Sequence, residues 1–281
     1  MPSRKTRMVD VSGGQFLMGS DRHYPEEAPT RLIDVPSFRM DAACVTNDEF
    51  AAFVDATGYV TTSERPLDPK EQPNMPEAFY AAGSLVFRKS DHPVRLTDPS
   101  QWWDYIAGAC WKRPEGPDST LSGRGDHPVV HVSYVDASAY ARWAGKGLAT
   151  EEQWEYAAAT ACPEPATLNI WRGIFPVHNE RTNVAPFTVP ARLPVSKHSA
   201  LHHMLGNVWE WTSSIFETAA SSQPNCCSRT SATGVQIRKR ILKGGSYLCA
   251  DSYCRRYRPA ARIAGDEVST AGHIGFRCVE L

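Results

Sequence analysis

Two cysteines in the C-terminal third of the chain carry the strongest chemical signal in the sequence. Cys249 and Cys254 lie five positions apart and precede three arginines, Arg255, Arg256 and Arg258. Positive charge beside a thiol favours the thiolate form. Two thiolates with few other ligands suit a soft ion of low coordination number, and copper(I) is the natural candidate. A small disulfide loop, or two unrelated thiols, is the alternative that the spacing leaves open.

The remaining cysteines show no comparable pattern. No pair has the Cys-x-x-Cys spacing of a zinc knuckle or a redox motif, and zinc prefers four ligands. Lone cysteines usually pack as small core residues, which we expect of Cys44, Cys110 and Cys162. Cys226 and Cys227 are adjacent in a Ser/Asn/Pro-rich stretch, so we expect surface thiols or partners of a distant group. The count of 8 cysteines therefore does not predict four disulfides, and reduced thiols agree with a cytosolic protein.

The composition excludes several classes of protein. The 281 residues are 42% hydrophobic and 10% aromatic, which is enough to build a folded core. The 30 basic and 31 acidic residues give a net charge of -1, which provides no general attraction to nucleic acid or to an anionic lipid surface. No apolar run is long enough to cross a bilayer, and no apolar stretch follows the basic N-terminus as in a secretory signal. We therefore expect a soluble cytoplasmic protein without a nucleic-acid or membrane partner.

Other catalytic motifs are missing from the sequence. It contains no His-Glu-x-x-His pair for zinc, no Gly-x-Gly-x-x-Gly opening a helix, no Walker loop and no Gly-x-Ser-x-Gly turn. The turn Gly244–Ser246 could be mistaken for a nucleophile elbow, but no histidine lies close in sequence to act as its base. We expect structural or surface roles for the histidines, which include His127, His131, His178, His198, His202 and His203.

Local signals predict three short helices. Capping boxes place helix starts at Thr46, Ser133 and Thr150, because each is followed three positions later by Glu, Asp or Gln. Gly58 and Gly145 are expected to end the first two helices.

Short strands and loops make up the rest of the prediction. Two short strands are expected within residues 8–19, one near Leu85–Phe87 and one at Gly275–Val279. Residues 64–100 otherwise predict a long Pro-rich loop. No repeat, coiled coil or domain linker is visible, so the sequence predicts a single α+β domain with much irregular structure.

Motifs along the whole chain resemble those of the formylglycine-generating enzyme family. The resemblance runs in order through residues 8–281, which we take as one domain. It rests on Gly244–Arg262, Gly206–Ser213, Glu26–Pro29, Val45–Asn47, Trp111–Pro117, Asp126–Val129, Trp143–Lys146, Thr150–Ala157 and Gly275–Cys278. The resemblance implies a formylglycine-generating-enzyme fold, which is C-type-lectin-like.

The resemblance also implies oxidation of a cysteine in a type I sulfatase to Cα-formylglycine. Members of the family read a Cys-x-Pro-x-Arg segment in an unfolded or nascent polypeptide, and they use O2 and copper(I) held by two cysteines. The positions that match the copper ligands are Cys249 and Cys254. Ser246, Tyr253 and Trp209 match the oxygen and substrate site. We expect the protein to act as a monomer.

The implied mechanism follows from the chemistry of soft ligands. The substrate thiolate joins the two cysteines as a third ligand of copper(I), and O2 is then reduced. Hydrogen is removed from the substrate Cβ, and the resulting thioaldehyde hydrolyses to the aldehyde. Trp102 and Trp103 are further candidates for the groove that receives the peptide.

Two structural calcium sites are implied by the resemblance, and both depart from the family pattern. Asn183 stands where an Asp is usual in the first site, and His203 replaces an Asn ligand in the second. Calcium prefers hard oxygen ligands, so we expect one or both sites to be weakened. The implied ligands are Asn169, Ile170 and Asn183 for the first site, and Gly206, Val208 and Glu210 for the second.

The stretch before Gly206 lacks the glycines that the family carries there, although its length is kept. Positions that need a positive φ would then be strained. Kept length with changed chemistry suggests a compensated reading-frame slip between residues 182 and 202. A Gly- and Asn-rich version in the neighbouring frame of the coding DNA would support this hypothesis, and its absence would refute it.

Two other functions are open at this stage. A same-fold oxidase could act on another thiol or on a metabolite, or the altered loops could leave a non-catalytic binding module of this fold. A sulfatase gene beside the coding gene would favour the sulfatase substrate. Conversion of a Cys-x-Pro-x-Arg peptide would separate the catalytic from the non-catalytic protein.

Overall fold

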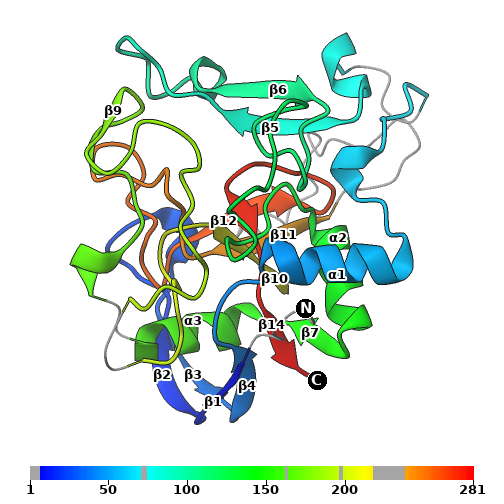
Figure 1. Cartoon of the computed structure of the whole chain (residues 1–281). Coiled ribbons are helices and arrows are strands. Elements are labelled where there is room, and N and C mark those ends of the chain that lie inside the picture. The colour runs from blue at the N-terminus through cyan, green and yellow to red at the C-terminus, as the bar shows by residue number, and fades with distance from the viewer. Residues whose placement is uncertain (1–6, 71–74, 162–163, 196–198, 218–237) are drawn as a thin grey trace.

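Figure 1 shows the computed structural model, which describes residues 7–70, 75–161, 164–195, 199–217 and 238–281. Cys162, Cys226, Cys227 and His198 lie outside the described residues, so the expectations for them stay predictions. In the described ranges, no helix combines the length and the apolar character that a membrane span requires.

Three α-helices begin where the capping boxes predict: α1 (Asn47–Thr57), α2 (Tyr134–Trp143) and α3 (Glu151–Ala161). At α1, the Thr46 hydroxyl accepts from the Glu49 backbone N–H at 3.4 Å, and the Glu49 carboxylate accepts from the Thr46 backbone N–H at 2.9 Å. Gly58 follows α1 with a φ of +66°, a left-handed conformation that glycine adopts without strain. The predicted helix starts are thus confirmed.

The strands are short and scattered along the chain. They are β1 (Met8–Val11), β2 (Gly14–Met18), β3 (Arg31–Val35), β4 (Phe38–Asp41), β5 (Gly83–Phe87), β6 (Trp103–Ala107), β7 (Lys146–Leu148), β8 (Gly173–Ile174), β9 (His178–Asn179), β10 (Trp209–Ile215), β11 (Lys239–Lys243), β12 (Arg262–Asp266), β13 (Ile274–Gly275) and β14 (Cys278–Glu280). Single 3-10 turns occupy Pro25–Glu27, Thr62–Glu64, Glu77–Tyr80, Pro99–Gln101 and Pro165–Thr167. The strands expected within residues 8–19 and near Leu85 are confirmed as β1, β2 and β5.

Within the described ranges the strands pair into two four-stranded sheets, with orders β1-β4-β14-β7 and β12-β11-β10-β13. The pairs β2–β3, β5–β6 and β8–β9 form separate two-stranded sheets. The β5–β6 pair lies at one end of the molecule and β2–β3 at the other, with β10, β11 and β12 between them (Figure 1). The single α+β domain that the sequence predicts is therefore confirmed.

The C-terminal segment differs from the single strand expected at Gly275–Val279. β13 pairs with β10 in the second sheet, whereas β14 pairs with β4 and β7 in the first. Between these strands Phe276 and Arg277 are buried. The chain changes sheets at this point because both side chains enter the core that the two sheets share.

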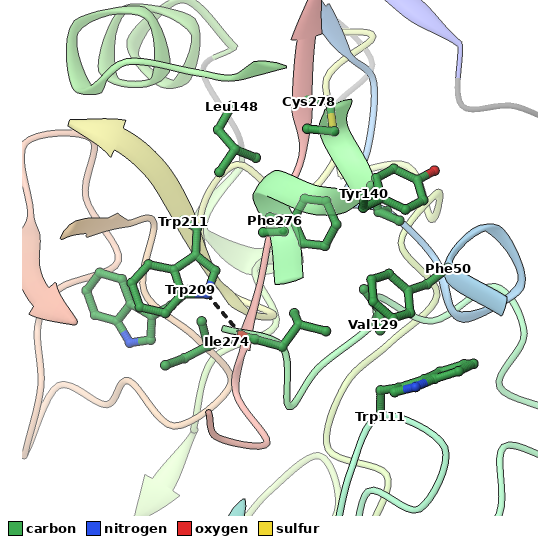
Figure 2. Packing of buried hydrophobic residues seen from close by; sticks show 14 of the residues in the cluster. Phe50, Trp111, Val129, Tyr140, Leu148, Trp209, Trp211, Ile274, Phe276 and Cys278 are labelled. Carbon is green, nitrogen blue, oxygen red and sulfur yellow. Dashed lines mark hydrogen bonds between the residues drawn. The ribbon is translucent and has the colours of Figure 1, made fainter. Parts of the chain in front are cut away.

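A large hydrophobic cluster joins the helices to the sheets (Figure 2). The rings of Phe50 from α1 and Tyr140 from α2 stack at 5.9 Å, and both meet the Phe276 ring edge-on. Trp209 of β10 and Cys249 belong to the same buried cluster. The core therefore reaches from α1 and α2 to the loop that carries the first predicted copper ligand.

A buried ion pair links the two four-stranded sheets. Arg277 Nε lies 2.7 Å from Glu210 Oε2, Arg277 Nη2 lies 2.8 Å from Glu210 Oε1, and both side chains are fully buried. Glu210 also accepts from Trp154 Nε1 at 2.8 Å and from Cys44 Sγ at 3.2 Å. Arg277 Nη2 further donates to the His202 carbonyl at 2.8 Å. Each carboxylate oxygen thus receives two donors from the protein itself.

Replacing Arg277 by methionine is expected to destabilise the protein by about 3–5 kcal/mol, because the Glu210 carboxylate would stay buried without its counter-charge. The free energy of unfolding in urea measures the effect. The double variant Arg277→Met/Glu210→Gln removes the orphaned charge and should recover part of the loss. If Arg277→Met were as stable as the wild type, the role of this ion pair in stability would be contradicted.

Candidate active site

The turn after β11 brings the two cysteines together. Gly244 and Gly245 have φ values of +95° and +74°, and a Cβ on Gly245 would come within 2.9 Å of the Arg256 carbonyl oxygen. Glycine therefore lets the chain fold back against the segment that follows the second cysteine. The Cys254 backbone N–H donates to the Ala250 carbonyl at 2.9 Å and closes a tight turn.

The two predicted copper ligands face each other across this turn. Cys249 Sγ and Cys254 Sγ are 3.3 Å apart, with Cys249 1% exposed and Cys254 partly exposed. Hydrogen bonding with the Cys249 thiol, helped by Arg256, lowers the pKa of Cys254 to about 6. Burial raises the pKa of Cys249. These opposite directions favour the thiolate on the more exposed sulfur, Cys254.

Of the three arginines expected to favour the thiolate, Arg256 acts on it directly. It lowers the pKa of the Cys254 thiol, because its charge and its polar hydrogens favour the thiolate. Arg255 is exposed, and its Nε lies 3.3 Å from the exposed carboxylate of Asp251. Arg258 pairs with the buried Glu27 carboxylate at 2.5 Å. Of the three arginines, Arg256 is therefore the one whose positive charge is available to the Cys254 thiolate.

Tyr253, a predicted site residue, is held by aromatic rings. Its ring stacks on Phe175 with centroids 4.5 Å apart and planes 2° from parallel. Trp102 meets the same ring edge-on at 5.4 Å. Trp102 is only 1% exposed, so its expected role in lining a peptide groove is wrong, and it supports Tyr253 from beneath. Phe175 carried no signal in the sequence, because its relation to Tyr253 exists only in the folded chain.

The other predicted aromatic and polar residues lie close by. Trp209 is 3% exposed and belongs to the same buried cluster as Cys249. The Ser246 backbone N–H donates to Cys249 Sγ at 3.4 Å, and the Ser246 hydroxyl accepts from the Leu248 N–H at 3.2 Å. Trp103 is partly exposed, and its ring lies 4.7 Å from that of His273. Of these residues, Ser246 contacts the thiol pair directly.

The donor set fits a soft ion of low coordination number. Two sulfurs lie within 3.3 Å of each other, and among the residues that the structure describes no three His, Cys, Asp or Glu side chains group together for metal binding. Thiolate sulfur prefers soft ions such as copper(I), whereas structural zinc requires four ligands. Cys249 and Cys254 could therefore hold copper(I) and leave room for a further soft ligand from outside.

Two of the residues implied as calcium ligands have side-chain oxygens that already accept hydrogen bonds from the protein. Both Glu210 oxygens are saturated by Arg277, Trp154 and Cys44. In the first set, Asn183 Oδ1 accepts from a backbone N–H at 2.9 Å. Hard oxygen ligands with free lone pairs are what calcium requires.

His203, which replaces the Asn ligand, is no substitute for it. Its side chain is buried, and burial lowers its pKa to about 3, so the ring is neutral. Its φ of +48° lies in the left-handed region that a bulky residue adopts only under strain. Strain at this position agrees with the loss of glycines before Gly206.

Comparisons with known proteins place the whole chain in one family. The model of the sulfatase-modifying factor enzyme 1-like domain matches residues 1–281. The formylglycine-generating enzyme of Mycobacterium tuberculosis is 45% identical over 98% of this chain and 97% of its own length. That of Streptomyces coelicolor is 41% identical over 98% of this chain and 90% of its own length.

A solved structure supports the fold. PvdO from Pseudomonas aeruginosa matches 97% of this chain and 93% of its own chain with a TM-score of 0.60. At 22% identity, that likeness concerns the fold alone. The family model and the two relatives span nearly the whole chain, and the chain therefore belongs to the family of sulfatase-modifying factor enzyme 1-like domains.

Proposed function

We propose that this protein is a formylglycine-generating oxidase. It converts the cysteine of a Cys-x-Pro-x-Arg segment in a type I sulfatase to Cα-formylglycine, with copper(I) and O2. The observation that carries the proposal is the pair of thiols 3.3 Å apart in a chain of this family. Full-length relatives that bear the name formylglycine-generating enzyme support the same reaction.

Each side of the site has a distinct task. Cys249 and Cys254 supply two soft ligands, and copper(I), when bound, supplies one-electron redox chemistry with O2. The partly exposed Cys254 side receives the substrate cysteine. Trp209, buried in the same cluster as Cys249, keeps water away from the inner sulfur.

The reaction balances with a single external oxidant. The substrate cysteine loses two electrons and two protons, one of them from Cβ, when it becomes a thioaldehyde, and O2 takes up both electrons and protons. Water then replaces sulfur at that carbon, and hydrogen sulfide leaves as the aldehyde forms. Tyr253, fixed between Phe175 and Trp102, stands beside the thiol pair where it can orient the substrate.

We also propose an unfolded or nascent sulfatase polypeptide as the partner, because a peptide segment must reach the thiols in extended form. A cytoplasmic, monomeric enzyme is part of the same proposal. The five cysteines found free among the described residues support a reducing compartment: Cys44, Cys110, Cys249, Cys254 and Cys278.

The copper(I)-loaded protein is expected to convert a Cys-x-Pro-x-Arg peptide to the aldehyde, with loss of the peptide thiol and uptake of O2. Mass spectrometry of the peptide and an oxygen electrode measure the two changes. The matched control peptide carries Ser in place of Cys. Normal copper binding without conversion of the peptide would refute this substrate and leave an oxidase of another thiol, or a binding module.

Cys249→Ala and Cys254→Ala should each abolish turnover, because either change leaves copper(I) with one thiolate. Cys110→Ala serves as the matched control, since this buried thiol lies outside the site and its loss should leave turnover unchanged. The rate of peptide conversion is the measurement. Activity retained in either site variant would rule out the two-thiolate centre.

We further propose that calcium is not a structural component of this chain, because Glu210, an implied ligand of one site, is saturated by donors and Asn183, implied for the other, accepts a backbone hydrogen bond. Addition of the chelator EGTA should leave Tm unchanged. Calcium is then added back in excess over EGTA, and an equal addition of magnesium is the control. A drop in Tm that calcium reverses and magnesium does not would contradict the proposal.

A further inference from the structure

The motif Glu26–Pro29, near the N-terminus, supplies no ligand and no reacting group to the thiol site. In the folded chain, the segment Tyr24–Glu27 lies against Arg255–Arg258, which directly follows the second cysteine. The contacts come from side chains and backbone alike, and they tie two segments that lie at opposite ends of the sequence. We call Tyr24–Glu27 the N-terminal strap.

The N-terminal strap encloses one guanidinium in particular. The Arg256 guanidinium carbon lies 3.7 Å from the centre of the Tyr24 ring. Glu26 Oε1 lies 2.6 Å from Arg256 Nη2. The Tyr24 hydroxyl also accepts from the Arg255 backbone N–H at 3.2 Å. Arg256 is therefore held by an aromatic face and by a carboxylate, and the backbone of the preceding residue is bound to the same tyrosine.

A free arginine side chain on the surface samples many rotamers, and fixing it costs conformational entropy. The side chains of Arg256 and Glu26 are 24% and 25% exposed, so their pairing is partly shielded from water. The stacking of a guanidinium on a tyrosine ring adds attraction in the same geometry. The N-terminal strap thus fixes Arg256 before any metal or substrate arrives.

The position of the Arg256 charge affects how stably the two thiols can hold a metal ion. Copper(I) with two thiolates carries one net negative charge, and this charge lies at the border of a buried cluster. Arg256 follows Cys254 by two positions and its charge favours the thiolate there, whereas Arg258 is committed to Glu27 at 2.5 Å. A positive charge held at this position stabilises the loaded site.

We propose that Tyr24 is a positioning residue for the metal site: it holds Arg256 against Cys254, so that the guanidinium stabilises copper(I) bound between the two thiolates. This inference rests on the proposed function for the identity of the metal. The N-terminal strap thus has a role in metal affinity. The sequence alone does not indicate this role, because the strap and the cysteines lie far apart in the chain.

Copper(I) affinity, measured by competition with a chromophoric copper(I) chelator, tests the proposal. Tyr24→Leu should weaken the affinity by about threefold to tenfold, because a freed Arg256 side chain loses conformational entropy when it is fixed beside the loaded site. Tyr24→Phe keeps the ring and should retain nearly the wild-type affinity. Glu27→Gln is the matched control, because it alters the same strap at the residue that pairs with Arg258 instead. Circular dichroism establishes that each variant is folded.

A double-mutant cycle shows whether Tyr24 acts through Arg256. Arg256→Gln should weaken copper(I) binding by itself, and adding Tyr24→Leu should then have no further effect. Wild-type affinity in folded Tyr24→Leu, an equal loss in Glu27→Gln, or additive losses in the cycle would each overturn the inference.

The same measurements separate this inference from the proposed function. Wild-type protein that fails to bind copper(I) would refute the proposed metal and this inference with it. Wild-type protein that binds copper(I) and shows the expected ranking of variants, but leaves the sulfatase peptide unchanged, would refute the substrate and keep the role of Tyr24.

Discussion

The buried pair of Glu210 and Arg277 is the interaction on which the rest of the structure depends. Glu210 belongs to β10, and Arg277 lies where the chain leaves one sheet for the other. Trp154 of α3 and Cys44 complete the hydrogen bonds of the carboxylate. Two buried charges are tolerated only when every donor and acceptor finds a partner. The pair is therefore satisfied only when both sheets and α3 are in their native positions.

The same constraint extends to the thiols. Glu210 lies opposite Lys243 in the pairing of β10 with β11, and Lys243 is also fully buried. Its ammonium lies 2.7 Å from the Glu155 carboxylate of α3. The glycine turn that begins at Gly244 thus leaves the sheet from a point fixed by two buried ion pairs. A site that brings two sulfurs together needs such a rigid origin, because small displacements separate reacting groups.

Sequence reasoning succeeded where short-range contacts determine the structure. Capping boxes located the helices because their hydrogen bonds join residues three positions apart, and Cys249 and Cys254 indicated the centre of the site because one turn connects them. The stacking of Phe175 on Tyr253 was beyond reach, since it joins distant segments. Trp102 shows the same limit, because its burial depends on rings supplied by other segments. The regular alternation near the C-terminus likewise could not show that its two halves enter different sheets.

The unequal burial of the two cysteines sets the direction from which a substrate can approach. Cys249 lies in the hydrophobic cluster, whereas Cys254 is partly exposed and lies in the chain between Tyr253 and Arg256. Stacking on Phe175 fixes the ring of Tyr253, and Tyr24 fixes the guanidinium of Arg256. A ligand that enters beside Cys254 therefore meets a rigid ring and a fixed positive charge. This combination favours a soft anionic donor, and the thiolate of a cysteine in an extended peptide is such a donor.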